Sequence, residues 1–282
     1  MLPSPGGMAF SLNQTIMGEQ KIAIIGGGNL GTAIADGLLN SGFTKPEHIL
    51  ITKRNIKTLA RLEEKGVLVS DQNREAVRFA DVLILAVKPF QVAAVLEDIK
   101  AGLDLKRHLL VSVVTGITNR KIQDLIGAPI PLVRAMPNTA IAIQESMTCL
   151  AAMNCTPEHS SYMEDLFRQL GRIAWIDEKL MDAATVLGAC GTAYAMRYIR
   201  ANIQGGIEIG FDAATASLIA AQTVKGAAEL LLKNGTHPEQ EIDKVTTPRG
   251  CTIAGLNQME HEGFSSSLIK GIVTSYEKIL KD

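Results

Sequence analysis

The turn inside Lys21–Leu39 constrains the fold more than any other stretch of the sequence. A short apolar run, Ile22–Ile25, is typical of a buried strand and leads into Gly26-Gly27-Gly28-Asn29-Leu30-Gly31. Apolar residues then recur at intervals of three and four, which predicts a helix. The spacing G-x-G-x-x-G between a strand and a helix is the context that a dinucleotide-binding fingerprint requires.

Three glycines of this turn each meet a different structural requirement. Gly26 permits a tight turn, Gly28 lets a pyrophosphate approach the backbone, and Gly31 lets the helix pack close to the strand. The N-terminus of the helix offers unpaired N–H groups and a partial positive charge to phosphates. A flexible turn without a ligand is the alternative, and Gly27 fits it, but the two flanks favour a nucleotide.

The composition limits the class of protein. A chain of 282 residues can form one large domain or two modest ones, and its net charge of −1 does not indicate a nucleic-acid or membrane-surface protein. No apolar stretch reaches the roughly 18 residues of a membrane span. The four cysteines and five histidines follow no metal-ligand spacing. We expect a cytoplasmic protein without a metal, nucleic-acid or membrane partner.

Residues 1–18 contain Pro, Gly and Ser but no basic residue. They therefore lack the n-region and the long apolar h-region of a signal peptide. We expect a loose N-terminal extension, with Met8 and Met17 as alternative starts.

Residues 19–176 alternate apolar strands with helical segments. The further strands are expected at 48–52, 67–70, 81–87, 109–114, 132–135, 147–152 and 173–176. The helices between them are expected at 55–65, 73–80, 89–99, 119–125 and 157–170. This rhythm predicts an α/β fold, a Rossmann-type doubly wound parallel sheet that binds its ligand at the C-terminal strand ends.

The end of the second expected strand indicates which dinucleotide binds. A site for NAD usually carries an acidic residue about 20 residues beyond the glycines. Here the stretch is Thr52-Lys53-Arg54-Asn55, where two cations can pair with a 2′-phosphate, or can be ordinary surface charges. The sequence therefore favours NADPH, with NADH as the alternative.

Two further residues near the expected strand ends leave their roles open. Lys88 directly follows a buried strand, so its side chain either contacts the ribose or nicotinamide or is simply solvated. Asn138 either forms a hydrogen bond near the nicotinamide or forms a turn.

Residues 177–282 are predicted to form a helical domain, with helices at 179–209, 213–232, 237–245, 252–261 and 265–280. The segment Ala213–Leu232 is apolar almost all round, so it should be buried on most sides. A small helical domain offers little core for it, and burial by a second subunit is the economical explanation.

The loop Thr246–Thr252 is the most site-like stretch of this half. It places hydroxyls and Arg249 beside Pro248 and Gly250, directly before a helix. Successive N–H groups at a helix start suit a carboxylate, whereas a local helix cap is the plain alternative.

Seven stretches taken in order make the chain resemble the pyrroline-5-carboxylate reductase family. They are IGGGNLGTAI (25–34), ADVLILAVKP (80–89), SVVTGIT (112–118), RAMPNTA (134–140), DEKLMDAAT (177–185), AQTVKGAAELL (221–231) and HPEQ…VTTPRGCTIAGL (237–256). The resemblance implies an oxidoreductase that performs the last step of proline synthesis, passing a hydride from nicotinamide C4 to C5 of 1-pyrroline-5-carboxylate. It also implies a helical dimerisation domain and a homodimer that assembles further.

The resemblance also assigns residues. The cofactor would be held by Gly26, Gly27, Gly28, Asn29 and Leu30 at the pyrophosphate, by Thr52, Lys53, Arg54 and Asn73 at the adenosine end, and by Ala86, Lys88, Pro89, Thr115 and Gly116 at the nicotinamide end. The substrate would contact Glu178, Thr247, Arg249, Gly250, Cys251 and Thr252, with the catalytic hydroxyl of Thr252 at the ring nitrogen.

The chain departs from the family pattern in its second half. The family usually has S-G-S-G-P-A-Y where this chain has Gly188–Tyr194, Gly-Gly where it has Arg249-Gly250, and a small residue or Thr at Cys251. Arg249 either adds a charge to the ligand site or points to solvent.

Three rival functions remain at this point. One is a reductase of another cyclic imine, and another is a β-hydroxyacid dehydrogenase. The latter needs a lysine in the helical domain, and neither Lys225 nor Lys244 lies in a matching motif. The third is a non-catalytic NADP-binding regulator, against which Thr247, Gly250 and Thr252 argue.

Overall fold

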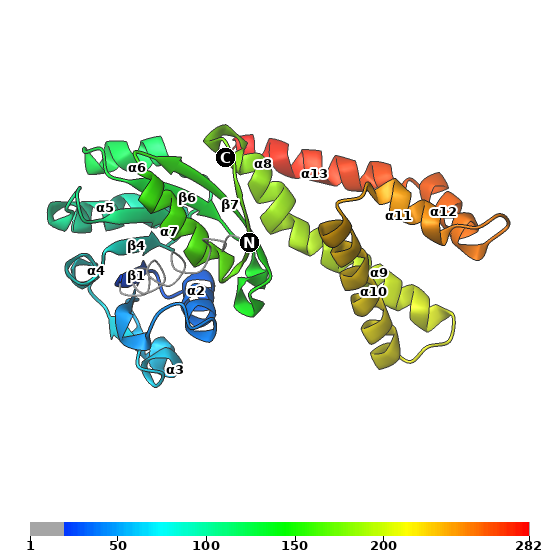
Figure 1. The fold of residues 1–282 in the computed structure, drawn as a ribbon, viewed down its shortest axis with the longest axis horizontal. Coiled ribbons are helices and arrows are strands. Elements are labelled where there is room, and N and C mark those ends of the chain that lie inside the picture. The colour runs from blue at the N-terminus through cyan, green and yellow to red at the C-terminus, as the bar shows by residue number, and fades with distance from the viewer. Residues whose placement is uncertain (1–19, 282) are drawn as a thin grey trace, which may run out of the picture. The chain divides into compact units, whose positions relative to one another are not determined.

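The structure is a computed structural model that describes residues 20–281. The expected extension at residues 1–18 lies outside the described residues. The chain divides into two compact units between Ala189 and Cys190. Each unit has its own architecture, a sheet covered by helices in the first and helices alone in the second (Figure 1).

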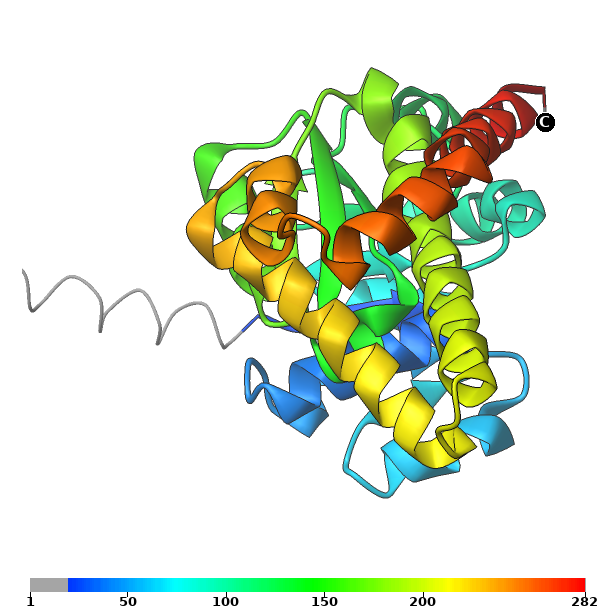
Figure 2. The same ribbon diagram turned by 90° about the vertical axis from the view of Figure 1, so that its right-hand side faces the viewer.

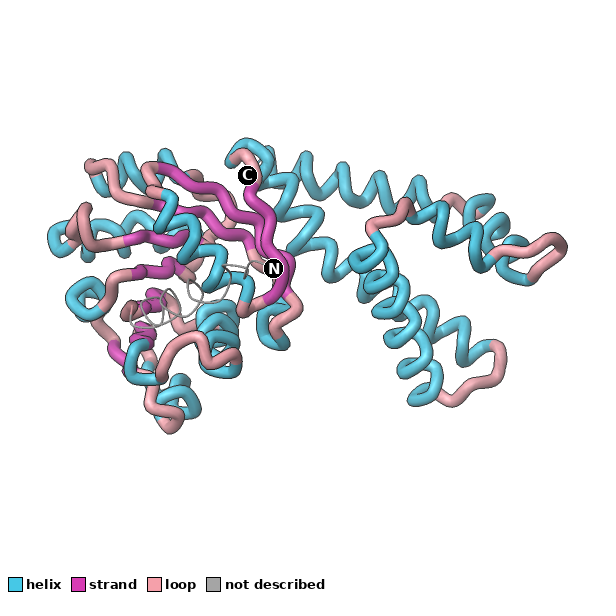
Figure 3. Tube along the Cα trace, in the orientation of Figure 1, coloured by secondary structure: helices cyan, strands magenta, loops and turns pink. Residues whose placement is uncertain are grey.

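Eight strands of the first unit form one sheet in the order β3-β2-β1-β4-β5-β6-β7-β8, drawn in magenta in Figure 3. They are β1 Ile22–Ile25, β2 Ile49–Thr52, β3 Leu68–Ser70, β4 Val82–Leu85, β5 Leu109–Ser112, β6 Leu132–Met136, β7 Ser146–Met153 and β8 Gly171–Trp175. The residues of β1, β2, β4, β5 and β6 are buried along their whole length, as apolar strands covered on both faces should be.

Helices cover both faces of this sheet. One apolar cluster joins it to α2 (Asn29–Asn40) and α7 (Pro157–Arg168), and also to α3 (Ala60–Glu63). The opposite cluster joins it to α4 (Asn73–Phe79), α5 (Val92–Ile99) and α6 (Asn119–Ile126). The predicted doubly wound architecture is therefore confirmed.

The expectation of a wholly parallel sheet is wrong at one place. Strands β1 to β6 pair in parallel, but β7 runs antiparallel to β6, and β8 is parallel to β7. Only residues 137–145, including the short helix η5 (Thr139–Ile143), connect β6 to β7. A connection this short cannot make the crossover that parallel neighbours need, so the chain turns back.

Short helical turns complete the first unit. They are η1 Pro46–His48, η2 Ile56–Leu59, η3 Pro89–Gln91, η4 Lys100–Gly102, η6 Glu178–Leu180 and α8 Met181–Ala184, and the π-helical turn η7 Thr185–Cys190 then runs across the boundary between the units. The sequence placed the domain boundary at residue 177, twelve residues before the end of the compact unit. The intervening segment stays with the sheet because Met181 is fully buried against Met136 and Ala151.

The second unit consists of five helices among the residues described. They are α9 Gly191–Glu208, α10 Ala213–Asn234, α11 Pro238–Val245, α12 Cys251–His261 and α13 Phe264–Lys281. Figure 2 shows α9 and α10 as a helical hairpin. Asp212 begins α10 by accepting hydrogen bonds from two N–H groups, and Gly235 ends it in a left-handed conformation.

Within a single chain α10 is largely exposed, whereas the sequence predicted burial on most sides, with a second subunit as the economical explanation. Only Ala216 and Ala220 of this helix are buried, whereas Leu218 is 70% exposed. Within residues 20–281, no helix is long and apolar enough to cross a bilayer.

Candidate active site

Two glycines of the first turn are required by close backbone packing. The N–H groups of Gly26 and Gly27 both donate to the Thr52 carbonyl, at 3.1 and 2.8 Å, which ties the end of β1 to the end of β2. Gly26 has a φ of +118°, and a Cβ there would lie 2.4 Å from the Ala86 carbonyl oxygen. A Cβ on Gly31 would lie 2.1 Å from the Gly26 carbonyl oxygen.

Gly28 differs from these two because a Cβ added there meets nothing within 4 Å. It precedes α2, whose N-terminus has no side-chain cap and no acidic residue in its first turn. The amides of the first turn, from Asn29 onward, are therefore open to an anion beside an exposed glycine. The residues fit a pyrophosphate at this turn.

Thr52 and Asn73 connect the end of β2 to the start of α4. The Thr52 side chain is almost fully buried, and its hydroxyl donates to the Asn73 Oδ1 at 2.8 Å. Thr52 is therefore placed to orient Asn73 through this hydrogen bond, and its hydroxyl is already engaged.

The two cations that follow Thr52 have no ion-pair partner among residues 20–281. Lys53 is partly buried and Arg54 is exposed. By contrast, Arg61 and Lys65 are both engaged by Asp36 of α2. The hydrogen bond from Arg61, with a smaller contribution from Lys65, holds the pKa of Asp36 below its usual value. Neither Lys53 nor Arg54 is engaged in this way, so both could pair with a 2′-phosphate.

The residues expected at the nicotinamide end follow β4 and β5. Ala86 donates its N–H to the Ile25 carbonyl at 2.8 Å, which places it beside the glycine turn. Lys88 is exposed and its N–H donates to the Gln91 side chain at 3.1 Å, while Pro89 begins η3. Thr115 and Gly116 are exposed, and Gly116 has a φ of +75°. Parallel pairing brings these strand ends to the same edge of the sheet as the glycine turn.

The structure favours the turn-forming role for Asn138. Its Oδ1 accepts the N–H of Ala140 at 3.0 Å, and its Nδ2 donates to the Gly188 carbonyl at 3.3 Å. Both ends of the amide are used to shape the connection after β6.

Glu178 has partners that the sequence did not indicate. Its Oε1 accepts the backbone N–H of Asn119, at 2.6 Å, and lies 3.7 Å from Nη1 of Arg134. Arg134 in β6 is 2% exposed at its side chain, and its Nη2 lies 3.1 Å from Asp182. The only sequence signal for this buried charge was an arginine within the apolar strand Leu132–Met136.

The loop Thr246–Thr252 belongs to the second unit. Gly250 donates its N–H to the Thr247 carbonyl at 2.9 Å, and a Cβ on Gly250 would lie 2.6 Å from the Thr247 hydroxyl oxygen. Gly250 starts α12 with no side-chain cap, so the plain helix-cap explanation does not hold. Cys251 and Thr252 in the first turn are exposed, which leaves their amides open to a carboxylate.

Two family models of known proteins match this chain, one in each half of the sequence. Residues 21–116 match a family model described as NADP oxidoreductase coenzyme F420-dependent. Residues 178–281 match a model described as pyrroline-5-carboxylate reductase dimerisation.

Curated relatives extend this match over most of the chain. Pyrroline-5-carboxylate reductase 2 of Dictyostelium discoideum is 46% identical over 93% of this chain and 93% of its own length. Pyrroline-5-carboxylate reductase 1 of the same organism is 47% identical over 92% of this chain, which spans only 49% of that relative.

A solved structure gives the same result for the fold. The Plasmodium falciparum pyrroline carboxylate reductase, determined with NADP bound, has a TM-score of 0.83 and 28% identity. The likeness covers 93% of this chain and 98% of that one. The chain belongs to the pyrroline-5-carboxylate reductase family.

Proposed function

We propose that this chain reduces 1-pyrroline-5-carboxylate to L-proline with NADPH, the last step of proline biosynthesis. The observation that carries the proposal is the turn at Gly28, where an uncapped helix N-terminus meets open space in a chain of this family. When bound, the reduced nicotinamide supplies the hydride that the imine carbon C5 accepts.

In this proposal the first unit binds and orients the cofactor. The amides of Asn29 and Leu30 hold the pyrophosphate, and Lys53 and Arg54 pair with the 2′-phosphate. Lys88 and Pro89 lie along the ribose and nicotinamide, and the exposed Thr115-Gly116 backbone lies beneath the ring. NADH lacks the 2′-phosphate and therefore binds less tightly.

The loop of the second unit anchors the substrate. Thr247 and the amides of Cys251 and Thr252 bind the carboxylate, and the Thr252 hydroxyl holds the proton at the ring nitrogen. A strong catalytic acid is unnecessary because a cyclic imine can enter already protonated or take a proton from water. The chain's main task is then to orient the two reacting carbons and exclude water.

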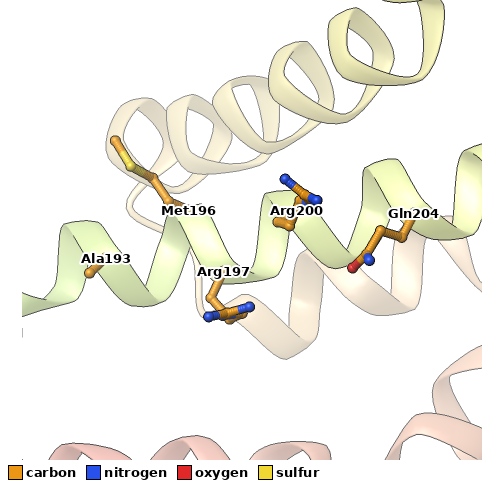
Figure 4. Close-up of a pocket in the computed structure, with 5 residues that line it drawn as sticks. All are labelled: Ala193, Met196, Arg197, Arg200 and Gln204. Atoms are coloured by element: carbon orange, nitrogen blue, oxygen red, sulfur yellow. The ribbon is translucent and has the colours of Figure 1, made fainter. Parts of the chain in front are cut away.

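The second unit also supports a homodimer, the basis of a larger homo-oligomer. Helices α9, α11, α12 and α13 bury no residue completely within a single chain. A pocket on α9 is lined by Ala193, Met196, Arg197, Arg200 and Gln204, all exposed (Figure 4). A second copy covering these helices accounts for exposed apolar surface in a unit that matches a dimerisation model.

A cytoplasmic location is part of the same proposal. All four cysteines are free, in agreement with a reducing compartment.

Substrate comparison tests the proposal. Oxidation of NADPH is followed with 1-pyrroline-5-carboxylate and with piperideine-6-carboxylate, and formation of NADPH from NADP+ is followed with a set of β-hydroxyacids. The proposal predicts fastest turnover with 1-pyrroline-5-carboxylate. Faster turnover of the six-membered imine would favour a different imine reductase, and no turnover of any substrate would favour a cofactor-binding regulator.

A further inference from the structure

A charged residue lies in the middle of the sheet where an apolar one is expected. Arg134 occupies β6, whose five residues are all buried. Its register neighbours are Ser112 in β5 and Ala151 in β7, small residues that leave room for a long side chain on that face. An unpaired charge here would be very costly, so its partners must be accounted for.

Two carboxylates from the segment after β8 face this arginine. Asp182 lies 3.1 Å from Nη2, and Glu178 lies 3.7 Å from Nη1. The Nε atom of Arg134 is buried without a hydrogen-bond partner among the described residues, as is Oδ1 of Asn119. Because an incompletely satisfied buried network costs stability, its presence favours a role beyond holding the fold.

Glu178 connects this network to the start of α6. Its carboxylate accepts the N–H of Asn119, the first residue of α6, at 2.6 Å. The Asn119 Nδ2 in turn donates to the carbonyl of Ala151 at 3.2 Å, and the Thr118 hydroxyl accepts the N–H of Lys121 at 3.1 Å. Three hydrogen bonds therefore fix the first turn of α6.

The loop held in this way is the one proposed to lie beneath the nicotinamide. Val113 is fixed at its near end by donating to the Leu85 carbonyl at 3.0 Å, and Asn119 is fixed at its far end by Glu178. Between them Thr115 and Gly116 are exposed. The position of these two residues therefore depends on how firmly both ends are held.

We infer that Arg134 and Glu178 are positioning residues that set the 115–118 loop, and through it the orientation of the nicotinamide. The inference rests on the proposed function, since it uses the nicotinamide role given there to Thr115 and Gly116. Arg134 fixes the Glu178 carboxylate, and Glu178 fixes the first amide of α6. The adenosine end depends instead on residues after β2, which is separated from β6 by β1, β4 and β5.

Titration with two different ligands distinguishes an effect on binding at the nicotinamide end from an effect at the adenosine end. NADPH and 2′,5′-ADP, which has the adenosine and the 2′-phosphate but no nicotinamide, are titrated calorimetrically into the full chain. In Glu178→Ala the Kd for NADPH should rise about 10-fold while the Kd for 2′,5′-ADP stays within about 2-fold, and kcat should fall by roughly 10-fold to 100-fold because the ring is misplaced.

Conservative variants and a control sharpen the comparison. Glu178→Gln keeps an oxygen that can accept the Asn119 N–H, so it should restore NADPH binding to within about 3-fold. Arg134→Lys keeps the positive charge but cannot face Glu178 and Asp182 with two separate nitrogen atoms. It should therefore raise the Kd for NADPH less than Glu178→Ala does, again without changing the Kd for 2′,5′-ADP. Glu97→Ala removes a carboxylate from the exposed ion pair with Lys100 in the same unit and should change neither Kd.

Other outcomes would overturn the inference. Equal weakening of both ligands in Glu178→Ala would indicate a purely structural role. A raised KM for the imine with unchanged Kd for NADPH would make Glu178 a substrate contact instead. These titrations need no imine, so a chain that binds NADPH but reduces no imine would contradict the proposed function alone.

Discussion

Arg249 is one of three described residues other than glycine that have a positive φ. It has a φ of +60°, in the left-handed region that glycine adopts without cost. The resemblance to the family led us to expect glycine there, and the backbone agrees with that expectation. Because an arginine in this conformation costs stability, its place in the proposed substrate loop indicates that its side chain contributes to ligand binding.

Replacing this residue should separate stability from binding. In Arg249→Gly we expect the free energy of unfolding to rise by about 1 kcal/mol, because the strain is relieved, while the KM for the imine also rises. The measurements are chemical denaturation and steady-state kinetics. Gln144→Gly, another residue with a φ of +60°, serves as the control with unchanged KM. An unchanged KM in Arg249→Gly would assign that side chain to solvent.

Thr252 carries the only catalytic hydroxyl in the proposal. Thr252→Ala should lower kcat by roughly 10-fold to 100-fold, the effect of losing one oriented polar contact at the reacting nitrogen. Thr236→Ala, which removes a hydroxyl bonded to Glu241 at 2.6 Å in the same unit, should leave kcat unchanged. An unaltered kcat in Thr252→Ala would remove Thr252 from the mechanism.

Residue roles were predictable to different degrees for physical reasons. The glycine turn could be read directly because its function depends on local backbone geometry. The partners of Glu178 could not, because they lie 44 and 59 positions away and meet only through the sheet. The hydrogen bond from the Thr52 hydroxyl to Asn73 was not predictable either, although both residues were expected at the adenosine end.

At the scale of elements, apolar runs predicted every strand, and the clearest of these runs form β1, β2, β4 and β5, which are buried along their whole length. The reversal at β7 was not predictable in this way, since alternation indicates which segments are strands but not their direction. Connection length carried that information: residues 137–145 are too few for a crossover.

The packing of α7 gives a test of the core. Tyr162 is 4% exposed, and its hydroxyl is buried without a partner in the described part of the chain. Tyr162→Phe keeps the ring and removes an unsatisfied polar group, so the free energy of unfolding should stay level or rise by up to about 1 kcal/mol.

A second tyrosine provides the matched comparison. The Tyr194 hydroxyl lies 2.6 Å from the Ser275 hydroxyl, linking α9 and α13. Tyr194→Phe should lower the free energy of unfolding by about 1 kcal/mol, with both variants measured by urea denaturation. A destabilised Tyr162→Phe variant would mean that its hydroxyl has a partner after all.

At the scale of the whole molecule, the second unit leaves large aliphatic residues exposed within a single chain. The helical content of this half was predictable from periodicity, but its partner was only inferred from the apolar surface of α10. Leu218 and Ile209 are 70% and 79% exposed, an unusual amount for large aliphatic side chains.

A charge on α10 should therefore break the assembly. Leu218→Glu is expected to shift the chain from an oligomer to smaller species, because a buried unpaired carboxylate is costly at an interface. Light scattering after size-exclusion chromatography measures the mass. Leu105→Glu, at an exposed leucine of the first unit, should leave the mass unchanged. An unchanged mass for Leu218→Glu would place the interface elsewhere.

The transfer of hydrogen from NADPH to the imine tests the central claim most directly. The chain is incubated with 1-pyrroline-5-carboxylate and NADPH carrying deuterium at both C4 positions of the nicotinamide, and the product is analysed by mass spectrometry. The account predicts proline with deuterium at C5, formed in equal amount to the NADPH consumed. Consumption of NADPH without proline, or proline without deuterium, would contradict it.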